Sequence, residues 1–155
     1  MSIAARHIPW ITPDEYLDRE ALSETKHMFY AGLVTAMVGG SLTHWIIAGN
    51  LQGMLYAGLR GRACRVGASD LLFRTGSGEM FTYPDVTVIC GPVEPVPGRK
   101  HVVTNPVFVA EVLSPSTEAI DRGGEVKGVP GERVIAAVCA DLPGAAVGGS
   151  LNAFY

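Results

Sequence analysis

The sequence predicts a mixed α/β fold in which helices flank one central sheet. One long segment has apolar residues at helical spacing, several short runs are rich in Val and Ile, and Gly- and Pro-bearing turns separate them. The chain has 155 residues, of which 48% are hydrophobic and 17% charged. These values are typical of a soluble globular domain large enough to bury a core. No apolar run approaches the roughly 18 residues of a transmembrane helix, so we expect no membrane partner.

Two helices are predicted in the first half of the chain. Residues 12–22 are expected to form a short helix, because Thr12 and Glu15 have the spacing of a capping box around a proline at the first helical position. Ser41 is a suitable N-cap for a long helix that ends near Leu59. Its apolar residues recur at helical spacing: Ile47, Leu51, Met54, Leu55 and Leu59.

The predicted strands are short and separated by turns. They are a hairpin over Phe29–Val38 and strands over Cys64–Arg74, Asp85–Cys90, Val107–Leu113 and Val134–Cys139. A turn at 76–78 and a loop over 91–98 connect them, and Ser114 with Pro115 is expected to begin a further helix.

Cysteine usage and the N-terminus indicate a cytoplasmic protein. Cys64, Cys90 and Cys139 are an odd number without a CxxC pair, so we expect reduced thiols rather than a disulfide framework or a zinc site. Residues 1–10 lack the basic start and apolar core of a signal peptide.

The charge of the chain weakly restricts its function. A net charge of −3 argues against a nucleic-acid coat protein, but not against a nuclease, whose active site is a carboxylate cluster. Basic residues form two groups. For both groups, solvated surface charge is the preferred interpretation and contact with phosphates is the alternative. The groups are Arg60, Arg62 and Arg65, and Arg99 with Lys100.

Two carboxylates are the strongest candidates for chemistry. Glu111 lies within a predicted strand, where alternation places it on the same face as Val109 and Leu113. A carboxylate on an apolar strand face is costly unless it is paired, binds a metal or lies at the rim. Asp85 follows Pro84, which cannot donate to a central ladder, so Asp85 is expected at a strand end. We expect both carboxylates at one rim, close enough to share a Mg²⁺ ion. The residues alone leave a structural alternative open, in which Asp85 caps a turn and Glu111 pairs with an arginine.

A family resemblance favours the metal-site hypothesis. Over about Trp10 to Gly123 the chain resembles the Uma-two family of restriction endonucleases, within the PD-(D/E)XK nuclease superfamily. The segments that carry the resemblance are KHMFYAG, MVGGSLTH, LRGRACRV, SDLLFR, YPDVTVICG and NPVFVAEVLSPSTEAIDRG.

The resemblance implies a restriction-endonuclease-like core and a metal-dependent DNA endonuclease. Asp85 and Glu111 correspond to the two acids of the motif and would bind Mg²⁺ or Mn²⁺, which activates water. Asp70 and His44 match an acidic position and a histidine of the family and complete the set of catalytic candidates. DNA is the implied partner, and a homodimer is compatible with the family. For His44 alone, a structural hydrogen-bonding role at the start of a helix is the alternative.

Two departures from the family bear on activity. The family usually has a glutamate where this chain has Met28, and a thioether is a poor Mg²⁺ ligand. The lysine of the superfamily motif would stand at Leu113, where this chain has leucine. In this family another lysine, located after the position of Gly123, is expected to replace it. Lys127 lies near that position but is out of register with it. The alternatives are therefore a non-catalytic DNA- or protein-binding relative, and a remnant that folds poorly.

We predict that residues 124–155 are a frameshifted tail that follows an endonuclease-like domain over residues 1–123. Read one base later, the codons would encode or permit the family's ending: Lys or Arg at Glu125–Val126, Tyr at Val129–Pro130, and Tyr-Val-Leu-Ile over Val138–Leu142. Sequencing the gene tests this prediction. A shifted frame without the lysine and the YVL-like strand would contradict it.

Overall fold

A computed structural model describes residues 10–75, 78–113 and 133–138. The chain divides into two compact units, which are described separately. The first unit comprises Met1–Gly39, Leu71–Tyr83 and Pro95–Thr104, and the second comprises Gly40–Asp70, Pro84–Glu94 and Asn105–Tyr155. In the described part of the chain, no helix has the length and apolar character needed to cross a membrane.

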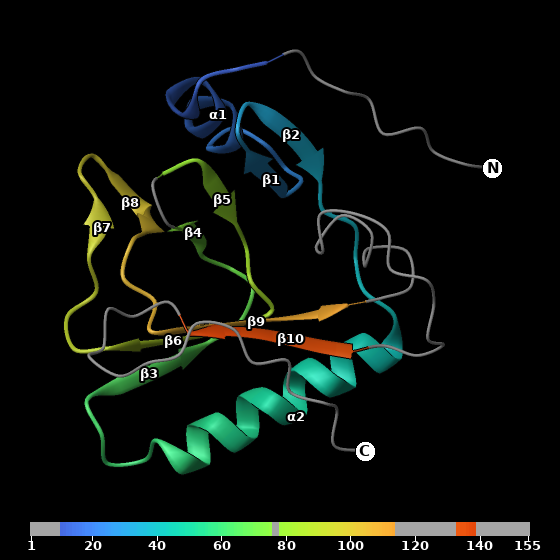
Figure 1. Ribbon diagram of the computed structural model, residues 1–155, viewed down its shortest axis with the longest axis vertical. Helices are drawn as coiled ribbons and strands as arrows, with labels where there is room; N and C mark the ends of the chain where they lie inside the picture. The colour runs from blue at the N-terminus through green and yellow to red at the C-terminus, as the bar shows by residue number, and fades with distance from the viewer. Residues whose placement is uncertain (1–9, 76–77, 114–132, 139–155) are drawn as a thin grey trace. The chain divides into compact units, whose positions relative to one another are not determined.

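The first unit contains a short helix and a six-stranded mixed sheet (Figure 1). The sheet order is β2-β1-β5-β4-β8-β7, with β4 and β8 parallel and the other neighbours antiparallel. The elements are α1 (Pro13–Glu20), β1 (His27–Tyr30), β2 (Leu33–Ala36), β4 (Leu72–Thr75), β5 (Met80–Thr82), β7 (Pro95–Val96) and β8 (Arg99–Val103).

Local sequence signals explain how α1 and the hairpin form. Thr12 and Glu15 make both hydrogen bonds of a capping box at the start of α1, and the two bonds to Thr12 lower the pKa of Glu15. Strands β1 and β2 are joined by Ala31 and Gly32, which have φ angles of 45° and 89°. Two positive φ angles are those of a type I′ turn, the usual two-residue hairpin connection.

Aromatic side chains form the core of the first unit. Tyr16, Phe29 and Phe81 are each at most 2% exposed, and their ring centroids lie 5.1 to 5.7 Å apart. The Tyr16 hydroxyl donates to the His27 carbonyl oxygen at 2.6 Å, and burial raises the pKa of Tyr16. Leu72 and Val102 complete this cluster from the strands, so α1 is packed on the sheet through its buried face.

The second unit contains a long helix and a four-stranded antiparallel sheet of order β10-β9-β6-β3. Helix α2 packs against this sheet and contacts β3, β6 and β9 (Figure 1). Strand β6 is buried along most of its length, because Val86, Thr87, Val88 and Ile89 are all at most 6% exposed. The elements are α2 (Leu42–Gly58), β3 (Cys64–Gly67), β6 (Val86–Cys90), β9 (Phe108–Leu113) and β10 (Arg133–Val138).

The predicted α/β class with a mixed sheet and flanking helices is confirmed, although the strands divide between two sheets. Both helices, the hairpin and the strands β6, β9 and β10 lie within a few residues of their predicted positions. The single strand predicted over Cys64–Arg74 is wrong: a turn at Ser69–Asp70 separates β3 from β4, which belong to different sheets. Strands β5, β7 and β8 occupy segments for which we predicted no strand, and β7 lies within the loop predicted over 91–98. The helix predicted at Ser114 lies outside the described residues.

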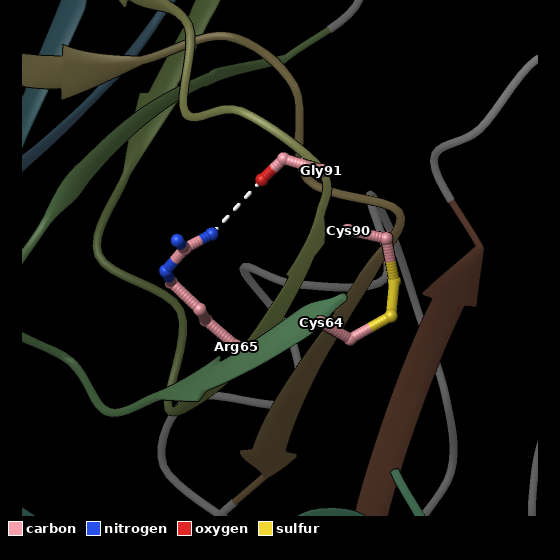
Figure 2. Close-up of a disulfide and its surroundings, with 4 residues drawn as sticks. All are labelled: Cys64, Arg65, Cys90 and Gly91. Carbon is pink, nitrogen blue, oxygen red and sulfur yellow. Dashed lines mark hydrogen bonds between the residues drawn. A yellow bond between two sulfur atoms is a disulfide. The ribbon is translucent and has the colours of Figure 1, made fainter. Parts of the chain in front are cut away.

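The prediction of reduced thiols at Cys64 and Cys90 is wrong, because the two sulfur atoms form a disulfide with an S–S distance of 1.99 Å (Figure 2). These cysteines are direct partners in the antiparallel register of β3 and β6. The same strand ends are joined by a hydrogen bond from Arg65 Nη1 to the Gly91 carbonyl oxygen at 2.9 Å. Since 26 residues separate the cysteines, only the strand pairing brings them together. Cys139 lies outside the described residues.

Candidate active site

Asp85 is held at the start of β6 through both oxygens of its carboxylate. Oδ1 lies 2.9 Å from Nε2 of His44, and Oδ2 accepts a hydrogen bond of 2.8 Å from the backbone N–H of Val112. The side chains of Asp85 and His44 are 18% and 20% exposed. The carboxylate is therefore fixed in orientation while its surface stays partly accessible to solvent.

Pro84 explains why the ladder between β6 and β9 ends here. Val86 is the partner of Ala110 in the antiparallel register. Continuing this register by two residues sets Pro84, before Val86, opposite Val112, after Ala110. Proline has no N–H to donate to a ladder. The Asp85 carboxylate bonds the Val112 N–H instead of a backbone carbonyl, which places an acidic side chain at the strand end.

Glu111 is the neighbour of Asp85 on the adjacent strand. Continuing the pairing of Val86 with Ala110 by one residue sets Asp85 opposite Glu111. Directly opposite residues of antiparallel strands point to the same face, with Cβ atoms about 5 Å apart. Glu111 is half-buried and also pairs with Ile135 of β10. The register therefore supports the expected pair of neighbouring carboxylates.

His44 reaches Asp85 from the first turn of α2. Ser41 caps this helix, and its side chain accepts the backbone N–H of His44 at 3.0 Å. The half-buried residues of α2 recur at helical spacing from His44 through Ile47 and Leu51 to Leu55, so His44 lies on the face packed against the sheet. Because Nε2 faces a carboxylate oxygen, this nitrogen carries the hydrogen and donates it.

Asp70 belongs to the same unit as this pair, whereas Met28 belongs to the first unit. Asp70 is an exposed turn residue just after β3, and the pairing of Gly67 with Thr87 puts it at the same end of the sheet as Asp85. Met28 lies on β1 in the first unit, where it is the partner of Thr35. The structure thus brings together His44 and Asp85, with Glu111 as the register neighbour.

The donor set fits one hard divalent cation with water as the remaining ligands. Two carboxylates are what Mg²⁺ usually takes from a protein, because it keeps several of its waters. Among the described residues, each Asp85 oxygen has one hydrogen-bond partner, and its second lone pair can bind a metal. Within the described part of the chain, no group of three or more His, Cys, Asp or Glu residues is arranged to hold a metal ion. In a site made of Asp85 and Glu111, water would be expected at the remaining positions around the cation.

Sequence reasoning missed a second polar cluster, in the first unit. The Glu20 carboxylate, 6% exposed, accepts the His27 N–H at 2.8 Å and the Tyr83 hydroxyl at 3.0 Å, and lies 2.9 Å from Nδ1 of His27. Burial and the Glu20 charge raise the pKa of Tyr83. Since these hydrogen bonds join α1, β1 and the residue that follows β5, the evident role of the cluster is structural.

Comparisons with known proteins identify relatives of this chain. The Uma2 family model, described as "Putative restriction endonuclease", matches residues 13–127. Uncharacterized protein slr1290 of Synechocystis is 40% identical over 121 residues, which are 77% of this chain and 62% of that protein. Uncharacterized protein sll1609 of the same organism is 32% identical over 112 residues, which are 72% of this chain and 63% of that protein.

A solved structure shares the fold. The crystal structure of "a putative nuclease belonging to DUF820" from Anabaena variabilis matches with a TM-score of 0.57 and 19% sequence identity. The match covers 73% of this chain and 64% of the other. The chain therefore has the fold of that protein, and it spans less than two thirds of the length of each of these relatives.

Proposed function

The chain belongs to the Uma2 family of restriction-endonuclease-like proteins, and on this premise we propose that it is a metal-dependent endonuclease that hydrolyses phosphodiester bonds in DNA. The observation that carries the proposal is the Asp85 carboxylate, fixed at a strand end by His44 and the Val112 N–H and next to Glu111 in the strand register. Active sites often lie at such strand ends, where a rigid sheet positions partly accessible polar groups.

The three side chains have distinct roles in this proposal. Asp85 and Glu111 bind Mg²⁺ or Mn²⁺, which supplies an activated water and stabilises the charge of the phosphate. His44 donates its Nε2–H to Asp85 and so keeps the carboxylate in one orientation. Asp70, at the same end of the sheet, is the candidate for a further contact to metal-bound water or substrate.

A plasmid-nicking assay tests the proposal. We expect the protein to convert supercoiled plasmid to the nicked form in the presence of Mg²⁺ or Mn²⁺ and to stop when EDTA removes the metal. The matched control is Asp14→Asn, which removes an exposed carboxylate from α1 in the first unit and should leave nicking unchanged. Nicking that continues in EDTA would contradict a metal-dependent reaction.

A non-catalytic DNA-binding relative is the second candidate. It is favoured by Met28, which stands where the family usually has a glutamate. This alternative predicts a shift of labelled DNA in a binding assay without cleavage at any metal concentration. Cleavage that requires Asp85 would exclude it.

A further inference from the structure

The imidazole of His44 lies where any residue other than glycine at position 40 would place its side chain. An ideal Cβ built on Gly40 stands 2.5 Å from both Cγ and Nδ1 of His44, and 3.0 Å from its Cβ. Non-bonded carbon atoms are in contact at about 3.5 to 4.0 Å. A methyl group at position 40 and the imidazole in its present place therefore exclude each other. Gly39, the preceding residue, has no atom within 4 Å of its ideal Cβ.

The overlap cannot be relieved by a small movement of a side-chain tip. The nearest atoms are at the base of the His44 side chain, and its backbone is held in the first turn of α2 by Ser41. The ring would have to turn about its Cα–Cβ bond, and this rotation carries Nε2 away from Oδ1 of Asp85. Gly40 is not among the residues with positive φ, so alanine suits its backbone and acts only through the added methyl group.

We propose that Gly40 is a positioning residue of the active site, whose missing side chain lets His44 hold the Asp85 carboxylate. The effect passes from Gly40 to the His44 ring and from its Nε2–H to Oδ1 of Asp85. Without His44, only the Val112 N–H on Oδ2 remains of the two contacts described for the carboxylate, so its orientation about the Cβ–Cγ bond is less restricted. The consequence for a bound metal rests on the proposed function, whereas the consequence for the His44–Asp85 contact does not.

The first test is a comparison of Gly40→Ala with Gly39→Ala by NMR at one fixed pH. The ¹⁵N shift of Nε2 in a histidine ring reports its hydrogen bond. We expect the Nε2 signal of His44 to move in Gly40→Ala and to keep its wild-type position in Gly39→Ala. Thermal melts of both variants check that each is folded. An unchanged Nε2 signal in folded Gly40→Ala overturns the proposal.

The second test is a double-mutant cycle on Mn²⁺ binding, measured by calorimetry. Removing a group that orients a metal ligand typically weakens metal affinity about 10- to 100-fold, and we expect such a loss in both Gly40→Ala and His44→Ala. Because Gly40 acts through His44, Gly40→Ala should cause no further loss when His44 is already alanine. Equal losses from Gly40→Ala with and without His44 would show an independent effect and contradict the proposal.

The two tests separate this inference from the proposed function. If the wild-type protein binds no Mn²⁺, the proposed function fails, and the Nε2 signal alone decides whether Gly40 positions His44. If the wild type binds Mn²⁺ and Gly40→Ala binds it equally well with an unchanged Nε2 signal, the proposed function stands and the role of Gly40 is refuted.

Discussion

Replacing Asp85 by asparagine is expected to lower the rate of metal-dependent plasmid nicking by about 100-fold or more. Metal stabilisation of a developing charge is worth several kcal/mol, and about 3 kcal/mol corresponds to roughly 100-fold in rate. Asparagine has nearly the shape of aspartate, so its carbonyl oxygen can still accept the Val112 N–H, and its amide NH₂ can donate to Nε2 of His44 once the imidazole carries its hydrogen on Nδ1. The loss should therefore come from the missing charge and not from unfolding.

Initial nicking rates at saturating Mg²⁺, together with thermal melts, measure this effect. Glu111→Gln should cause a loss of similar size, because in the proposed site both carboxylates bind the same cation. Asp14→Asn serves again as the control for removal of a carboxylate elsewhere. If Asp85→Asn melts like the wild type and nicks at the wild-type rate, Asp85 is not part of the active site.

Replacing Phe29 by alanine is expected to destabilise the protein by about 3 to 5 kcal/mol, the usual cost of deleting a buried aromatic side chain. Phe29 is 1% exposed and contacts both Tyr16 and Phe81 through its ring. The truncation leaves a cavity between α1 and the sheet that rigid neighbours cannot fill. The melting temperature should fall by about 10 °C or more.

Tyr30 provides the matched control for this substitution. It is the next residue on β1, but its side chain is 57% exposed. Tyr30→Ala should cost less than about 1 kcal/mol, because surface substitutions change stability little. Urea unfolding followed by circular dichroism measures both variants. Equal losses for Phe29→Ala and Tyr30→Ala would contradict the assignment of Phe29 to the core.

Elements with local signals were predictable from the sequence. The capping box at Thr12 and the N-cap at Ser41 identify the starts of both helices, because these hydrogen bonds join residues three apart. The Val- and Ile-rich run of β6 predicts a buried strand, and Pro84 predicts that the strand begins close to Asp85. The candidate Asp85 followed from these signals, and the candidate Glu111 from its place on an apolar face of the strand predicted over Val107–Leu113.

Features that depend on pairing between distant segments were not predictable. Strand β8 has three polar residues in a row at Arg99–His101, and it is a strand because Val102 and Val103 pair with β4. The Cys64–Cys90 disulfide requires the register of β3 on β6. The close approach of the His44 ring to Gly40 depends on the direction in which the chain enters α2. Neither residue type indicates this direction.

Mn²⁺ binding tests the central claim most directly, since the claim is that Asp85 and Glu111 hold one divalent cation. Calorimetry of the wild-type chain should give one Mn²⁺ per chain, with binding strongly weakened in Asp85→Asn and in Glu111→Gln. The Mn²⁺ affinity of the double variant should be no lower than that of the single variant with the lower affinity, because removal of either carboxylate already disrupts the shared site. Mn²⁺ that binds the double variant with wild-type affinity and stoichiometry would contradict the account.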